Sequence, residues 1–279
     1  MPATYAHWYF GDECYKTLSP KYKKIVDEHR GLYDIGVHGP DIFFYDLKEK
    51  DVVNYGHDMH DTPAHNFFER CRVIYKSHNE KEEMMAYILG FLSHFDLDSN
   101  CHGYICEKVI VDNITHNKIE SEYDRHLLEQ DNKKSTANRA KSLKPSKENA
   151  KIISYFFPFD ENTVYKTLKA QKLIVSFLST RTYIKRETLK LITNKLNASY
   201  QFDLITDKKE YEPCKDSNLR IDKLKKKALD MYPKLLKNII GYFKEEEKLC
   251  EFFDNDFNSN FEDGDIQVLS YEEEQKYKV

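Results

Sequence analysis

Histidines and carboxylates recur at four-residue steps in two short stretches of the chain. In residues 94–102 these side chains are His94, Asp98 and His102, and in residues 116–124 they are His116, Glu120 and Asp124. Residues four apart lie on one face of an α-helix, with Cβ atoms about 5–6 Å apart. Imidazole nitrogens and carboxylate oxygens both bind zinc, and burying such a group is costly unless a cation neutralises it. Two facing helices of this kind predict a metal site.

The first half of the chain holds all eleven histidines, and none follows His126. We therefore assign the chemistry to this half. Other polar side chains upstream of the two stretches can complete a metal site. The candidates are Asp41 in the segment HGPDIFFYD and either His57 or His60 in the segment YGHDMHDTP.

Composition indicates a folded, helical chain. Of the 279 residues, 40% are hydrophobic and 14% aromatic, which excludes a disordered chain. Glycine and proline are scarce, with 9 and 8 residues, which favours helices over a turn-rich β architecture. We expect an all-α fold, a multi-helix bundle with the metal site in its N-terminal half.

Charge is distributed unevenly along the chain. Residues 1–130 carry 14 basic and 23 acidic side chains, residues 131–245 carry 26 and 13, and residues 246–279 carry 3 and 11. The acidic first part suits cation binding, and the basic middle suits phosphate groups or an anionic membrane surface. No secretory signal or stretch of 18 apolar residues is visible. We expect a cytoplasmic protein without a transmembrane segment, with secretion left open if the sequence is a mature form.

Apolar residues at helical spacing predict helices over residues 3–15, 20–29, 64–75, 80–95, 116–128, 161–178, 182–196 and 219–243. Residues 31–61 are rich in Gly, Pro and Asp, so we expect them to be irregular, and we expect Gly103 to end the helix that precedes it. We divide the chain into a catalytic region at 1–130, a polar loop or linker at 131–150, and a helical region at 151–279 that packs on the first as one unit. The tail from residue 245 shows no assignable pattern.

Five short motifs occur in an order that is specific to one known family. They are AHW at 6–8, GPDIFFY at 39–45, HDTP at 60–63, SHFDLDSNCH at 93–102 and HNKIE at 116–120. In this order they resemble the zinc-dependent phospholipases C, whose fold type includes fungal single-strand nucleases and a glycosylphosphatidylinositol-cleaving phospholipase. The resemblance covers residues 1–130 and implies an all-helical domain that holds two to three zinc ions.

The resemblance also implies how the candidate ligands divide among the ions. One ion would take Asp41, His60, His94 and Asp98. A second would take His102, His116 and Glu120. A third would share Asp98 and add His7, and its remaining ligands would be the N-terminal amine and carbonyl, on Pro2 once Met1 is removed. His60 is preferred to His57 because the Asp-Thr-Pro that follows it resembles the family motif.

The activity that the resemblance implies is hydrolysis of a phosphodiester, with phospholipid as the substrate of a phospholipase C. Zinc lowers the pKa of bound water from about 15.7 to about 7 and so supplies hydroxide at neutral pH. That hydroxide would attack the phosphorus, and Asp41 would orient the water or accept its proton. Asp61, Asp96 and Asp124 would orient the imidazoles. Peripheral contact with a membrane is expected for such a substrate.

Three other functions are compatible with the same residues. A nuclease or nucleotidase of this fold type would bind nucleic acid and clamp bases with aromatic side chains, and the 20 tyrosines and 17 phenylalanines allow it. Helical phosphohydrolases that use a His-Asp doublet match His57-Asp58 and His60-Asp61, but that reading leaves His116 without a role. A non-catalytic helical module would hold a fully coordinated structural zinc, with no water ligand.

Overall fold

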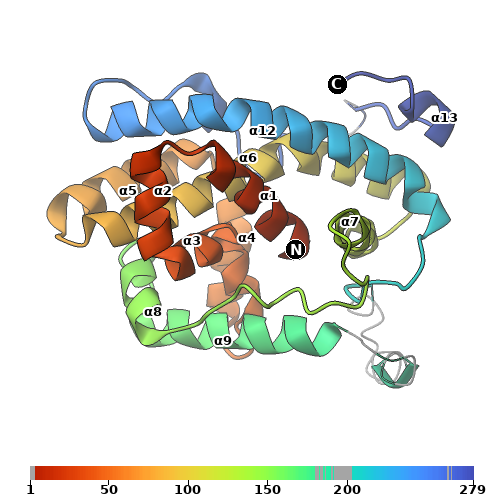
Figure 1. Ribbon diagram of the computed structural model, residues 1–279, viewed down its shortest axis with the longest axis horizontal. Helices are drawn as coiled ribbons and strands as arrows, with labels where there is room; N and C mark the ends of the chain where they lie inside the picture. The colour runs from red at the N-terminus through yellow and green to blue at the C-terminus, as the bar shows by residue number, and fades with distance from the viewer. Residues whose placement is uncertain are drawn as a thin grey trace.

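The chain folds as helices packed around one long central helix (Figure 1). The computed structural model describes residues 4–179, 182, 185, 187–189, 191, 203–262, 264 and 266–279. It is 70% helical, and the described residues contain no strand, so the predicted all-α fold is confirmed. The expected helix over 182–196 falls largely outside the described residues, as does Pro2.

The central helix is α6, Lys81–Asp112, and it is buried along most of its length. Helix α12, Lys215–Phe243, runs beside it, and α3, Arg30–Gly36, crosses it closely. A Cβ atom on Gly90 would lie 2.4 Å from the carbonyl oxygen of Tyr33, so the two backbones can approach only at a glycine. The expectation that Gly103 ends this helix is wrong. The helix continues to Asp112, and Asn113, with a φ of 52°, takes the left-handed conformation that ends it.

The N-terminal part is more regular than the sequence indicated. Helices α1, Thr4–Thr17, and α2, Pro20–Glu28, lead into α3, the 3-10 helix η1, Gly39–Tyr45, and α4, Lys50–His60. The expectation that residues 31–61 are irregular is therefore wrong. Some of the Gly and Pro residues in this segment mark the ends of short helices, as Gly36 does in α3 and Pro40 in η1, whereas Gly56 lies inside α4.

The remaining helices surround this core. They are α5, Ala64–Ser77, α7, His116–Gln130, α8, Lys147–Ser154, and α9, Glu161–Leu178. The segment between α7 and α8 runs across the molecule and buries Arg139, Ala140 and Leu143. A short 3-10 helix, η2, Glu212–Cys214, precedes α12.

The tail after α12 turns back onto the core and contains two short elements, η3, Glu251–Asp254, and α13, Tyr271–Glu274. Phe253 and Phe257 are buried in the same apolar core as α6. No helix within the described residues combines the length and the apolar character needed to cross a membrane.

Candidate metal centre

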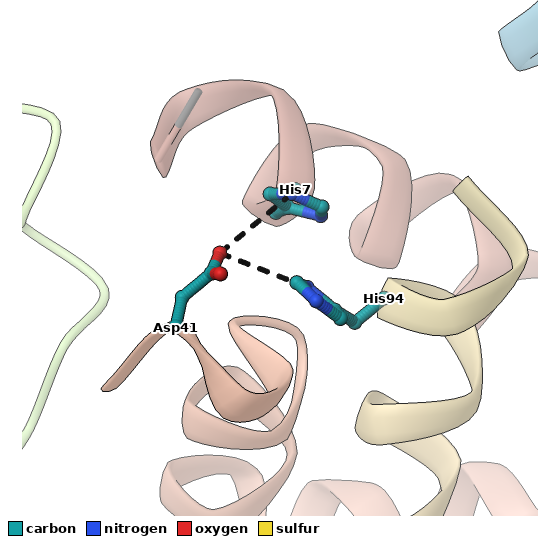
Figure 2. A group of neighbouring side chains, drawn as sticks. All are labelled: His7, Asp41 and His94. Atoms are coloured by element: carbon teal, nitrogen blue, oxygen red, sulfur yellow. Dashed lines mark ion pairs between the residues drawn. The ribbon is translucent and has the colours of Figure 1, made fainter. Parts of the chain in front are cut away.

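Five predicted ligands meet where α1, η1, α4 and α6 converge, and we call them the first cluster. Its members are His7, Asp41, His60, His94 and Asp98. The two oxygens of Asp98 lie 3.2 Å from Nε2 of His7 and 3.0 Å from Nε2 of His94. Asp41 faces the same space, with Oδ1 3.1 Å from Nε2 of His60 and Oδ2 4.0 Å from His7 and from His94. Figure 2 shows the carboxylate of Asp41 facing both of these last two imidazoles.

Local backbone geometry positions the imidazoles of the first cluster. Gly39, with a φ of 48°, lets the chain pass directly over the ring of His94, and a Cβ atom there would lie 2.1 Å from Cδ2 of that ring. The ring of His7 stacks on the ring of His94, with centroids 4.3 Å apart. Nδ1 of His60 bonds to the carbonyl of Gly56 at 2.7 Å, which turns Nε2 toward Asp41.

The other three predicted ligands form a second cluster on α6 and α7, and its members are His102, His116 and Glu120. Nε2 of His116 lies 3.0 Å, and Nε2 of His102 3.5 Å, from Oε1 of Glu120. Thr115 caps α7, because its side chain accepts the backbone N–H of Lys118, and the helix therefore begins at His116. Asp98 links the clusters, since its Oδ1 is also 3.5 Å from Nε2 of His102.

The two clusters fit a set of divalent cations. Each of three triads keeps its nitrogen and oxygen atoms within 4.8 Å of one another: His7, Asp41 and His94; His60, His94 and Asp98; and His102, His116 and Glu120. Several of these atoms are buried and have no hydrogen-bond partner among the described residues, including both nitrogens of His94, Oδ2 of Asp41 and Oε2 of Glu120. Such atoms are costly to bury unless they bind a cation. The mixture of imidazole and carboxylate ligands is one that zinc binds.

Comparison with known proteins supports a zinc site. A family model described as "Zinc dependent phospholipase C" matches residues 6–239. The chain belongs to this family. No curated protein and no solved structure matches the chain. The match runs across residues 130 and 150, where we place the boundaries between regions, and it does not divide the chain there. The predicted division therefore stays a prediction.

Membership in the zinc-dependent phospholipase C family implies zinc dependence. The protonation states of Asp98, Glu120 and His94 are those that bind a metal ion. Burial raises the pKa of Asp98, but the imidazoles around it, His102 foremost, hold the pKa well below its ordinary value. Burial also raises the pKa of Glu120, but the groups around it, His116 foremost, together outweigh burial and lower the pKa. Burial lowers the pKa of His94. The carboxylates therefore remain ionised and His94 remains neutral, which are the forms that bind a metal.

His7 differs from the other imidazoles. Burial lowers its pKa, but Asp98 and Asp41 outweigh burial and raise the pKa to about 8. In the metal-free chain this imidazole carries a proton at neutral pH, and a bound cation would have to displace that proton.

The structure brings together all eight side chains that we predict as ligands of this phospholipase C family member. His57 is not among them: it is exposed on α4, and its ring packs against Phe44 at 4.5 Å. The predicted ligand role of the N-terminal amine lies outside the described residues. The assignment of individual ligands to individual ions stays a prediction.

The expectation that three aspartates orient imidazoles is wrong. Asp61 accepts a hydrogen bond from Asn258, and Asp96 accepts one from Asn100. Asp124 accepts the backbone N–H of Ala6 at 2.8 Å and the guanidinium of Arg139 at 2.9 Å. Asp124 thus holds the first turn of α1, next to His7, and no periodic pattern in the sequence connects Arg139 to it.

Proposed function

We propose that the protein is a zinc-dependent phosphodiesterase, and specifically a phospholipase C that releases the phosphorylated headgroup of a phospholipid. The family match supports hydrolysis of phospholipid. The observation that carries the proposal is Asp98, which lies between the two clusters and within 3.5 Å of imidazoles from both. A carboxylate shared in this way suits two cations held side by side, the arrangement used by enzymes that displace groups at phosphorus.

The chain supplies the ligands, a base and an open side. Zinc, when bound, acidifies water and neutralises the charge that develops on the phosphate oxygens. Oδ1 of Asp41 is engaged by His60, whereas its Oδ2 has no hydrogen-bond partner among the described residues. We assign Asp41 to orienting the attacking water and accepting its proton at this oxygen. His116 is the most exposed ligand, with 24% of its side chain accessible, so the substrate enters on its side.

The test is a comparison of three substrates with the zinc-loaded protein: phosphatidylcholine micelles, single-stranded DNA and a simple aryl phosphodiester. A phospholipase C releases phosphocholine from the micelles faster than it cleaves DNA. Faster cleavage of DNA would replace this proposal with a nuclease. If none of the three substrates is hydrolysed and protein atoms occupy every coordination position of the zinc ions, the zinc is structural.

We also propose that one face of α12 contacts an anionic membrane surface. An open groove there is lined by a single acidic residue, Asp230, and by five lysines. The lysines are Lys223, Lys226, Lys227, Lys234 and Lys278. Each lysine near an anionic surface contributes about 1 kcal/mol of attraction.

Sedimentation with vesicles tests this contact. We expect binding to vesicles that contain phosphatidylserine and not to phosphatidylcholine alone, and loss of binding when Lys226, Lys227 and Lys234 are changed to Glu. The matched control changes Lys21, Lys23 and Lys24 of α2 to Glu. Equal loss in both triple variants, or no binding by the unaltered chain, would contradict the proposal.

A further inference from the structure

The segment that follows the family match returns to the metal centre. The match ends at residue 239, and the tail leaves α12 after Phe243. Residues 255–259 then lie against the end of α4, the start of α5 and the middle of α6. We call these five residues the clamp segment.

The clamp segment completes two helix ends beside His60. A helix leaves its last carbonyl groups and first N–H groups without partners inside the helix. His60 is the last residue of α4, and its carbonyl accepts the backbone N–H of Phe257 at 3.1 Å. Ala64 is the first residue of α5, and its N–H donates to the carbonyl of Asn255 at 3.0 Å. The tail thus joins the two ends and fixes the short link between them.

Asn258 reinforces the link from its side chain. Its amide donates to Oδ1 of Asp61 at 2.7 Å and lies 3.4 Å from the carbonyl of His60. The residue after a metal ligand is therefore held directly by the tail. Outer partners of this kind set the orientation of a ligand, and their loss typically costs about 10–100-fold in metal affinity.

Phe257 covers the first cluster from behind. It is buried, and its ring centroid lies 5.5 Å from that of His60 and 5.8 Å from that of His94. Its other neighbours are aromatic as well, with the ring of Phe95 at 5.2 Å. An apolar ring in this position excludes water from the back of both imidazoles and strengthens their interaction with a cation.

The tail is anchored at two points along α6, and these contacts hold the clamp segment in place. Ser259 donates to the carbonyl of Ser99 at 2.7 Å, and Gly264 donates to Glu107 at 2.7 Å. Further along, Glu274 is fully buried and pairs with Arg220 of α12 at 2.6 Å. Breaking a buried pair of this kind is costly, which keeps the tail in place.

We propose that the clamp segment is a positioning device for His60 and His94, and that its positioning residues are Asn258 and Phe257. Zinc affinity of the first cluster then depends on these two side chains, whereas that of the second does not. The second cluster takes its three ligands from α6 and α7 alone, and within the described residues no hydrogen bond or ring contact joins Asn258 or Phe257 to them. Ser259 of the clamp segment accepts the N–H of Gly103, next to His102, at 3.3 Å, and it stays unaltered in the test. The inference rests on zinc binding by the clusters. It does not depend on the phosphodiester chemistry proposed above.

Competition between the protein and a chromophoric zinc chelator measures the effect without any substrate. We expect Asn258→Ala to weaken zinc binding about 10-fold in the first cluster and to leave the second cluster unchanged. Repeating the titration in a His116→Gln background isolates the first cluster. The matched control is Gln275→Ala, in the same tail but with an exposed side chain on the far side of the Glu274 anchor.

Two further measurements separate positioning from general stability. In a double-mutant cycle, Asp61→Ala should add nothing to the loss already caused by Asn258→Ala, because both remove the same hydrogen bond. Thermal unfolding of the metal-free proteins should differ little between Asn258→Ala and Gln275→Ala. Unchanged zinc affinity in Asn258→Ala would overturn the proposal. Equal weakening of both clusters, together with a lower unfolding temperature of the metal-free chain, would also overturn it.

Discussion

The first and second clusters use the same kinds of side chain but are assembled in different ways. The second takes its ligands from consecutive helices, α6 and α7, joined by residues 113–115. The first takes its ligands from four elements, and it brings His7 at the start of the chain to within 3.2 Å of Asp98. Local helix formation therefore aligns much of the second cluster, whereas the first exists only when the whole chain has folded. Disturbing tertiary contacts should empty the first cluster before the second.

The largest effect is expected at the residue that the clusters share. Asp98→Asn removes the charge that both sets of imidazoles face, and we expect hydrolysis to become undetectable and at least one zinc to be lost. Zinc content by elemental analysis and turnover of a phosphodiester measure this. Asp58→Asn, on the exposed face of α4, should retain both. Full metal content and turnover in Asp98→Asn would refute the shared role.

A glycine pair tests the first cluster by itself. Gly39→Ala places a methyl group 2.1 Å from a ring carbon of His94, whereas Gly264→Ala, also at a positive φ, meets nothing within 4 Å. Both variants place alanine at a positive φ, and Gly264, at 89°, lies further from the left-handed region that alanine can adopt than Gly39 does at 48°. We therefore expect only Gly39→Ala to lose zinc from the first cluster, with the second cluster still filled. Equal zinc loss in both variants would mean that backbone strain, and not His94, is responsible.

The second cluster should fail without disturbing the first. His116→Gln removes one of three ligands, and we expect zinc affinity there to fall by more than the ~10–100-fold that the loss of an outer partner costs. The first cluster should keep its affinity, because Asp98 still faces His7 and His94. Chelator competition on the variant should show one class of tight zinc in place of two. Loss of both classes would show that the clusters do not form independently.

The smallest effect concerns the contact between α7 and α12. Burial raises the pKa of Asp222, but His126, Tyr123 and Gln130 outweigh it and lower the pKa. A carboxyl with a lowered pKa stabilises the fold above its unfolded pKa of about 3.9, and this contribution is lost as the pH falls through the folded value. Asp222→Asn should cost about 1 kcal/mol of unfolding free energy at pH 7, and the difference should shrink below about pH 4.

Urea unfolding at several pH values measures this contribution. Asp230→Asn on the same helix, where the carboxylate is exposed and pairs with Lys226, should change stability very little. Zinc affinity of the second cluster should stay within about twofold of the unaltered chain. A large loss of zinc in Asp222→Asn would contradict the view that the second cluster is assembled locally.

The sequence predicted the second cluster better than the first because the ligands of the second come from consecutive helices. His116 and Glu120 are one helical turn apart and follow a capping Thr115, so their common face can be read from spacing. His7 carries no such signal, and only the resemblance to the phospholipases C pointed to its part in the first cluster. Asp41 was a candidate from its segment HGPDIFFYD, but only the resemblance assigned it to an ion. Their neighbours in space come from other elements, and spacing along the chain cannot reveal them.

The supporting contacts were beyond local pattern reading. Asp124 reaches the backbone of Ala6 across 118 residues, and Asn258 reaches His60 across 198. Tertiary packing alone decides such pairs. The tail showed no apolar periodicity because its residues act singly: one ring behind the imidazoles, and separate hydrogen bonds to helix ends.

Zinc titration of the metal-free protein, with turnover recorded at each addition, tests directly whether hydrolysis requires zinc in both clusters. We expect no hydrolysis without zinc, little after the first equivalent and full activity only when both clusters are filled. A protein that hydrolyses the phosphodiester equally well without zinc, or that fills both clusters and hydrolyses none, would contradict this expectation.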